Sequence, residues 1–356
     1  MKERIEKIQS ILKEGEGALV RSDANRFYLT GFHSSEGTLV VTPKRAVFLV
    51  DFRYIEKARS VIHHTEVVLM ERLLAQVAEI CKEDGVGRLL VETESMNLGM
   101  HSRIASALKE ITVPADDNRL DTALTDARAI KTRGELANII AAQQMTDETF
   151  SYIIERITPG RTEREVALDM EFFMRRLGSE GVSFDFIVVS GKNSSLPHGV
   201  PTEKKIEVGD FVTMDFGAIV NGYHSDMTRT VAIGRVDDDQ RKVYETVLAA
   251  QTAGIEFLRA GVKGVDADRV ARDIIYGAGY EGCFGHSLGH SVGIEIHEAP
   301  SCSPRCDQVL AAGTVMTVEP GIYLENRFGV RIEDMVYITE NGCENLTASR
   351  KDLLIL

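Results

Sequence analysis

Five residues in the C-terminal half of the chain have side chains suited to binding divalent metal ions. They are four carboxylates and one imidazole: Asp215, Asp226, His290, Glu319 and Glu333. A tetrahedral structural zinc site is usually built from cysteine and histidine, whereas an oxygen-rich set favours ions such as Mn²⁺, Co²⁺ or Fe²⁺. Two such ions held side by side can activate water for hydrolysis. The set therefore predicts a hydrolase with two divalent metal ions, Mn²⁺ first and Co²⁺, Fe²⁺ or Zn²⁺ as alternatives.

The spacing of Asp215 and Asp226 predicts that both lie on one face of a β-hairpin. Asn221-Gly222 lies between two strand-like segments, which is typical of a two-residue type I′ turn. Counting back from the turn pairs Gly217 with Asp226, and Asp215 shares the face of Gly217 because side chains alternate along a strand. The two carboxylates are then diagonal neighbours about 7–8 Å apart, and they repel each other unless a cation lies between them. A bulge would break this count, and two solvated aspartates beside a turn are the alternative.

The two glutamates are expected at the end and on one face of strands. Glu319 precedes Pro320, so a strand that begins near residue 314 stops there with the carboxylate at its end. Arg331 and Glu333 project to one face of a strand over 329–336, with apolar residues opposite. A charged face on an otherwise apolar strand is either exposed to solvent or part of a site.

Four histidines lie in polar, glycine-rich segments: His198 in LPHG, His286 and His290 in FGHSLGH, and His297 in EIHE. The spacing of His286 and His290 invites comparison with helical zinc motifs, but the flanking glycines disfavour a helix and no glutamate lies between the two histidines. We expect an extended segment that presents His290 to a metal ion. A single histidine is more often a surface or core residue, but four beside this carboxylate set are site candidates.

The composition argues against several other classes of function. The chain has 356 residues, enough for two domains, with 44% hydrophobic and 27% charged residues. Its formal net charge of −13 argues against nucleic acid or an anionic membrane as a partner, because phosphate binding requires clustered lysine and arginine. The five cysteines are scattered, no apolar run is long enough to span a bilayer, and the first residues predict an amphipathic helix, not a secretory signal. We expect a cytoplasmic protein with reduced thiols.

Two domains are predicted. Residues 1–125 alternate short strands with helices, which indicates an α/β domain, and no catalytic set is found in them. The polar segment 114–135 is expected to be the linker. Residues 126–356 show three helical periodicities separated by strand-rich segments, and the second helix begins with a capping box formed by Thr162 and Glu165. This order favours an α+β catalytic domain with an antiparallel sheet.

Four segments of the second domain resemble, in order, the motif set of the Xaa-Pro peptidases. They are DFGAIVNGYHSD, HSLGHSVGIEIHE, VEPGIY and VRIED. This family includes aminopeptidase P and proline dipeptidase (prolidase) and has the pita-bread metallopeptidase fold. The segment NRFYLTGFHSSEGTLVVTPKRAVFLVDFRY is similar to the non-catalytic, creatinase-like N-terminal domain of these enzymes. The resemblance implies an α+β protein with an N-terminal α/β domain and a C-terminal pita-bread domain.

The resemblance also implies that all five carboxylate and histidine candidates are metal ligands. Asp226 and Glu333 would bridge the two ions, while His290 and Glu319 would hold the second one. A water activated by the metal pair would attack the carbonyl group before proline, and Glu319 would carry a proton to the leaving nitrogen.

Three histidines and one arginine are implied to act on the substrate or the ligands. His198 and His297 would contact the peptide, and His297 would help to stabilise the oxyanion. His286 would lie near the proline side of the pocket, and Arg331 would orient Glu333. The predicted catalytic residues are His198, His297, Glu319 and Arg331.

One departure from the family pattern bears on substrate length. Members that prefer dipeptides commonly carry an arginine shortly after the histidine of the EIHE-like segment, where it can hold the free carboxylate of the substrate. Here Ser301 takes that place in HEAPSCSP, which favours longer peptides unless Arg305 or another basic residue substitutes. The expected partners are dipeptides or short peptides with proline at the second position. Many relatives form homodimers, although no feature of this sequence proves one.

Three other functions account for the sequence less completely. Methionine aminopeptidase shares the metal set but usually lacks the N-terminal domain and the LPHG form. Creatine-hydrolysing relatives share the fold without the full ligand set. A non-catalytic peptide-binding module would not need five ligands. The sequence therefore favours an active Xaa-Pro metallopeptidase.

Overall fold

The structure, a computed structural model, describes residues 1–356 and divides into two compact units. Unit 1 comprises Met1–Arg128 and unit 2 comprises Ala129–Leu356. The domain boundary predicted from the sequence lies at residue 125.

The segment predicted to be a polar linker is largely helical. Helix α6 (Arg119–Ala129) occupies its middle, with Leu120, Leu124 and Ala127 buried. These positions have the spacing of one helix face, but the many polar residues around them hide the pattern. Thr132 and Glu135 then form a capping box at the start of α7 (Arg133–Ile154). The segment expected to be the linker is therefore mostly helical, and the division between the two units falls within it.

Unit 1 contains a five-stranded mixed sheet with the strand order β4-β3-β2-β1-β5. The strands are β1 (Glu16–Val20), β2 (Thr38–Val41), β3 (Ala46–Val50), β4 (Glu66–Leu69) and β5 (Arg88–Val91). The helices before α6 are α1 (Lys2–Ser10), α2 (Asp23–Thr30), α3 (Ile55–Val61), α4 (Leu73–Asp84) and α5 (Leu98–Ala107). Every residue of β2 and β3 is buried, so the centre of the sheet is covered on both faces, as in an α/β unit.

Four helices belong to unit 2. They are α7, α8 (Glu163–Arg176), α9 (Asp238–Phe257) and α10 (Gly264–Gly277). Helix α8 begins with the predicted capping box, in which Thr162 and Glu165 satisfy each other's backbone N–H groups. No helix anywhere in the structure is both long enough and apolar enough to cross a bilayer.

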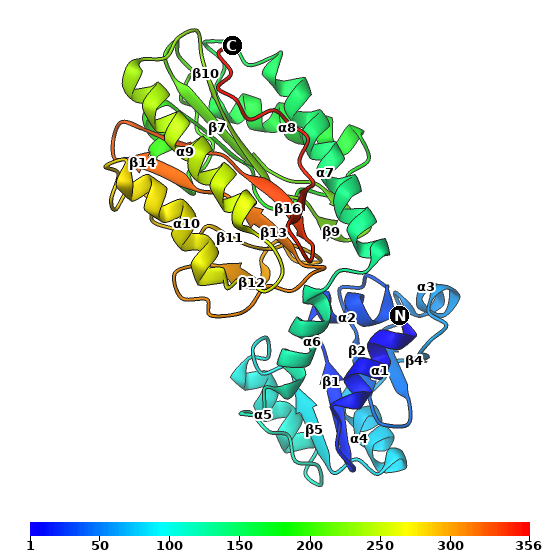
Figure 1. Cartoon of the computed structure of the whole chain (residues 1–356). Helices are drawn as coiled ribbons and strands as arrows, with labels where there is room; N and C mark the ends of the chain where they lie inside the picture. Colours follow the sequence, from blue (N-terminus) through cyan, green and yellow to red (C-terminus); the bar gives the residue numbers. More distant parts are fainter. The chain divides into compact units, whose positions relative to one another are not determined.

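Two antiparallel sheets and two short hairpins form the strand layer of unit 2 (Figure 1). The sheets have the orders β10-β7-β6 and β12-β11-β13-β16-β17, and the hairpins are β14-β15 and β8-β9. The strands are β6 (Ile187–Ser190), β7 (Phe211–Phe216), β8 (Ile219–Val220), β9 (Tyr223–His224), β10 (Met227–Ala232), β11 (Gly289–Ser291), β12 (Glu298–Cys302), β13 (Val315–Val318), β14 (Gly321–Leu324), β15 (Phe328–Arg331), β16 (Asp334–Ile338) and β17 (Cys343–Asn345). Helices α7 and α8 pack against β6, β7 and β10, while α9 and α10 share a second core with β13, β15 and β16. The α+β architecture with antiparallel pairing agrees with the prediction.

The hairpin that carries both aspartates has the predicted register. Asn221 and Gly222 have φ angles of 48° and 74°, as a type I′ turn requires. Val220 pairs with Tyr223, and the same register continues to the pairs Phe216 with Met227 and Asp215 with Thr228. No bulge intervenes, so Asp215 and Asp226 lie diagonally across one hairpin.

Two expected strands are divided at site residues. The segment 314–323 forms β13 and β14, separated by Glu319 and Pro320, because proline cannot donate to the strand ladder. The segment 329–339 forms β15 and β16, which belong to different sheets. Between them, the backbone N–H of Glu333 donates to the carbonyl of Thr228 (3.1 Å). Glu319 and Glu333 thus occupy points where the chain leaves one strand and enters another.

Candidate metal centre

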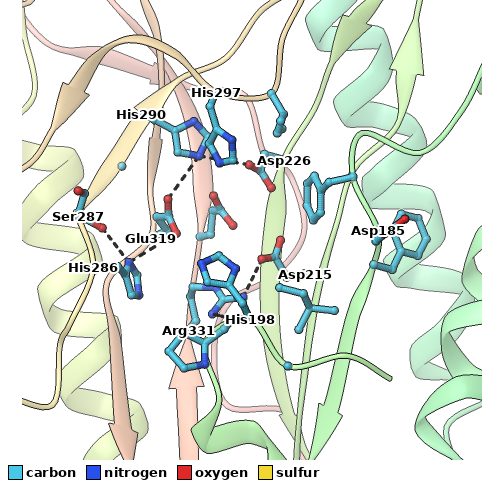
Figure 2. Close-up of a pocket in the computed structure, with 18 of the residues that line it drawn as sticks. Asp185, His198, Asp215, Asp226, His286, Ser287, His290, His297, Glu319 and Arg331 are labelled. Atoms are coloured by element: carbon cyan, nitrogen blue, oxygen red, sulfur yellow. Dashed lines mark hydrogen bonds and ion pairs between the residues drawn. The ribbon is translucent and has the colours of Figure 1, made fainter. Parts of the chain in front are cut away.

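All nine predicted site residues line one cavity of unit 2, which has a volume of about 590 Å³ (Figure 2). They are His198, Asp215, Asp226, His286, His290, His297, Glu319, Arg331 and Glu333. The aspartates come from the β7–β10 hairpin, His290 and Arg331 come from β11 and β15, and the other five come from segments that connect these elements. The fold therefore gathers side chains that are far apart along the chain.

Three of the predicted ligands form a compact triad. The ligand atoms of Asp226, His290 and Glu333 lie within 4.8 Å of one another. Nε2 of His290 is 3.7 Å from Oδ2 of Asp226 and 3.5 Å from Oε1 of Glu319. Asp226 and Glu333 are 4% and 1% exposed, so neither is a solvated surface carboxylate.

The protein supplies too few cations and hydrogen-bond donors to neutralise and pair all the carboxylates of the cluster. Oδ1 of Asp215 and Oδ1 of Asp226 are buried without a hydrogen-bond partner, a costly state for polar atoms. Burial and the charges of neighbouring carboxylates raise the pKa of Asp226 and of Glu333. Burial also raises the pKa of Glu319 to about 8. Buried, unpaired carboxylate oxygens fit hard divalent cations, which take oxygen ligands and would compensate this charge.

His290 is held in the form that a metal ligand requires. Its Nδ1 lies 3.1 Å from the carbonyl oxygen of Ser291. A carbonyl oxygen only accepts, so Nδ1 carries the proton and Nε2 presents its lone pair to the carboxylates. Burial lowers the pKa of His290 to about 4, which keeps the ring neutral. Its backbone N–H donates to Oγ1 of Thr317, and that hydroxyl donates to Oε1 of Glu319.

Arg331 makes its ion pair with Asp215, and not directly with Glu333. The guanidinium donates to Oδ2 of Asp215 (2.7 Å) and to Oγ1 of Thr228 (2.9 Å). Thr228 in turn donates to Oε2 of Glu333 (2.7 Å). The two hydrogen bonds connect Arg331 to Glu333 through Thr228, so the predicted orientation of Glu333 by Arg331 would be indirect. The hairpin count places Thr228 opposite Asp215, but only the folded chain shows that its hydroxyl reaches Glu333.

The remaining histidines surround the same space. Figure 2 shows His297 beside His290, and the two ring centroids are 4.4 Å apart in a T-shaped arrangement. Nδ1 of His286 lies 2.9 Å from the carbonyl oxygen of Ser287 and carries the proton, so Nε2 accepts from the hydroxyl of Tyr323 (2.9 Å), which itself accepts from Arg331. Burial, followed by the charge of Arg331, lowers the pKa of His286 to about 3. Tyr323 belongs to the VEPGIY segment, yet nothing in that motif shows that it joins His286 to Arg331.

Comparison with known proteins shows the family. Residues 137–340 match metallopeptidase family M24, and residues 4–122 match the Creatinase/Prolidase N-terminal domain. The chain belongs to metallopeptidase family M24. The resemblance inferred from the motifs, the order of a creatinase-like domain before a pita-bread domain, and the assignment as a metallopeptidase are thereby confirmed.

Relatives of this M24 metallopeptidase match it over nearly its full length. It is 38% identical to an Xaa-Pro dipeptidase of Pyrococcus furiosus, with 99% of this chain and 100% of the relative covered. The structure of an Xaa-Pro dipeptidase from Bacillus anthracis has 41% identity and a TM-score of 0.95, covering 99% of each chain. The crystal structure of an X-Pro aminopeptidase from Thermotoga maritima has 34% identity and a TM-score of 0.90, and the match covers 98% of this chain and 99% of that one. These similarities support neither a methionine aminopeptidase nor a non-catalytic binding module.

Metal binding to the metal-free M24 chain is expected to release protons at neutral pH. Burial raises the pKa of Glu319 to about 8, so this carboxyl group is mostly protonated before it binds a metal and must then ionise. Calorimetric titration with Mn²⁺ in buffers of different ionisation enthalpy measures the release, which should shrink at a pH well above this pKa. Equal, negligible release at both pH values would contradict the prediction.

The same raised pKa predicts how the stability of the metal-free protein depends on pH. A carboxyl group with a raised pKa in the folded state stabilises that state while it is protonated. This contribution is lost as the pH rises from the ordinary value of 4.5 through about 8. The Tm of the metal-free protein should therefore fall over this range, and the fall should be smaller with bound Mn²⁺.

Proposed function

We propose that this M24 metallopeptidase uses two divalent metal ions to remove the first residue from short peptides that have proline at the second position. The observation that carries the proposal is the cavity in which four carboxylates and His290 converge beside three further histidines. The names of its full-length relatives, Xaa-Pro dipeptidase and X-Pro aminopeptidase, support the choice of substrate.

The residues that would hold the ions are the five predicted ligands. They are Asp215, Asp226, His290, Glu319 and Glu333, and the triad of Asp226, His290 and Glu333 would form the centre of the site. When bound, such ions act as Lewis acids and lower the pKa of coordinated water. We expect Mn²⁺, because carboxylate-dominated sites suit it.

The other side chains would position the peptide and move protons. His297, beside His290 in the cavity, would donate to the carbonyl oxygen as negative charge develops there. His198 lines the same cavity and would contact the peptide near the scissile bond. Glu319 lines the same cavity and would carry a proton to the proline nitrogen as it leaves. Because an X-Pro bond has no N–H group, recognition must come from a pocket shaped for the ring.

The cavity favours peptides longer than two residues. Ser301 lines it, whereas Arg305 is exposed and is not among the lining residues. The one guanidinium in the lining, Arg331, is already bound by Asp215, Tyr323, Thr228 and the carbonyl of Pro197. No cation in the lining is therefore free to hold the carboxylate of a dipeptide.

The test is hydrolysis of Ala-Pro-Pro, Ala-Pro and Met-Ala-Ser by protein stripped of metal and reloaded with Mn²⁺. Ala-Pro-Pro should be cut faster than Ala-Pro, and Met-Ala-Ser should not be cut. Faster cleavage of Ala-Pro would overturn the inference about peptide length while keeping the proline assignment. Cleavage of Met-Ala-Ser alone, or of none of the three peptides, would overturn the proposed function.

A further inference from the structure

We propose that Lys131 is a positioning residue that holds His297 in the site through Glu298. This inference rests on the proposed function, because it assigns Lys131 a role in that same site. Lys131 precedes the N-cap of α7, and its side chain is 1% exposed. Its ammonium group donates to Oε2 of Glu298 (3.0 Å) and to Oγ of Ser291 (3.1 Å). Its backbone N–H donates to the carbonyl of Gly313 (2.9 Å), which fixes where the side chain starts.

Glu298 closes the turn that presents His297. It is the first residue of β12 and directly follows His297. While Oε2 accepts from Lys131, Oε1 accepts the backbone N–H groups of Ile294 (3.0 Å) and Glu295 (3.2 Å). A Cβ atom at Gly293 would lie 2.5 Å from Oε2, so the carboxylate fills the space that this glycine leaves. The turn is thus folded around one buried carboxylate.

Lys131 also connects the strands that carry the two neighbouring histidines. The pairing of β11 with β12 shifts between His290 and Ser291, so that Ser291 lies opposite Glu298. By bonding to both residues, the ammonium group joins β11 and β12 at this irregular step. His290 and His297 each precede one of the two residues that it binds. By holding these two strands together, Lys131 helps to set the distance between the two rings, whose centroids are 4.4 Å apart.

Loss of the ammonium group would remove one ion pair and one hydrogen bond from the buried carboxylate of Glu298. Such a charge is costly unless the group moves toward water or takes up a proton. Either change weakens its hold on the turn and lets His297 shift. A displacement of about 1 Å in a reacting group can lower turnover about 100-fold, while peptide affinity depends on many other contacts. The expected defect is therefore in kcat more than in KM.

The experiment compares Lys131→Met, His297→Ala and the double variant in hydrolysis of Ala-Pro-Pro. Lys131→Met should lower kcat by about 10- to 100-fold, as loss of residues behind a metal site commonly does, with KM changed less than about threefold. In the His297→Ala background the same substitution should cost little, because residues that act through one another are not additive. Lys131→Arg should recover part of the loss. The control is Arg119→Met, which removes a cation from the buried Glu16 of unit 1 and should leave kcat unchanged.

A second readout does not depend on activity. Imidazole resonances of His297 in the metal-free protein should move in Lys131→Met and stay in place in Arg119→Met. If the wild-type protein cuts no peptide, the proposed function fails, and this spectrum still tests the positioning role. Additive losses of kcat in the double variant, or unchanged His297 resonances in Lys131→Met, would overturn the inference.

Discussion

Glu333→Gln is expected to lower kcat/KM for Ala-Pro-Pro by more than about 100-fold. Loss of a residue that is only hydrogen-bonded to a metal ligand costs up to roughly 100-fold, and loss of a ligand should cost more. Glu333 is 1% exposed and belongs to the triad with Asp226 and His290. Glutamine keeps the shape of the glutamate side chain. It removes the negative charge, and it replaces one carboxylate oxygen with an NH₂ group that has no lone pair for a metal ion. The cluster would then lose one negative charge and one ligand oxygen, so metal content should fall together with activity.

Activity and bound Mn²⁺ should be measured on the same sample of this variant. Glu325→Gln is the matched control, because Glu325 is an exposed glutamate in the loop between β14 and β15. It should keep full activity and metal content. A Glu333→Gln protein that holds as much Mn²⁺ as the wild type and retains more than about a tenth of its activity would contradict a role for Glu333 as a metal ligand.

Arg331→Met is expected to lower the free energy of unfolding of the metal-free protein by about 3–5 kcal/mol, the usual cost of removing one partner from a buried ion pair. Arg331 is 3% exposed and is the one guanidinium that faces the carboxylate cluster. It bonds at once to Asp215, Thr228 and Tyr323. Without it, Asp215 loses its counter-charge and the hydroxyl of Thr228 loses the donor that orients it toward Glu333.

Urea unfolding of the metal-free variants at neutral pH measures this effect without interference from metal binding. Arg331→Lys should give an intermediate loss of unfolding free energy. An ammonium group keeps the charge, but it lacks the planar set of N–H donors with which a guanidinium binds several partners. Arg327→Met removes an exposed ion pair with Asp239 and should change stability by less than about 1 kcal/mol. A loss for Arg331→Met no larger than for Arg327→Met would contradict the account.

Local rules predicted the parts of this fold that depend on neighbouring residues. The Asn221-Gly222 turn determined a register that the structure follows back to Asp215. The capping box at Thr162 could be predicted from the sequence because its two partners are only three residues apart. The buried face of α6 was missed, because its apolar residues are few and stand among charged ones.

Contacts between distant segments could not be predicted by such rules. Thr228 reaches Glu333 across 105 positions, and Lys131 reaches Glu298 across 167. The first pair depends on how two strand segments pack against each other, and the second depends on how the start of α7 packs against the turn before β12. Local periodicity determines neither arrangement. The division of the strand 329–339 at Glu333 is a similar case, since it arises where the chain passes from one sheet to another.

Titration of the metal-free wild-type protein with Mn²⁺, with bound metal and the rate of Ala-Pro-Pro hydrolysis followed together, tests the central claim most directly. Two ions should bind per chain, and hydrolysis should be absent before the first addition and maximal once both sites are filled. Full hydrolysis by the metal-free protein, or a protein that binds no Mn²⁺ at this cluster, would contradict the account.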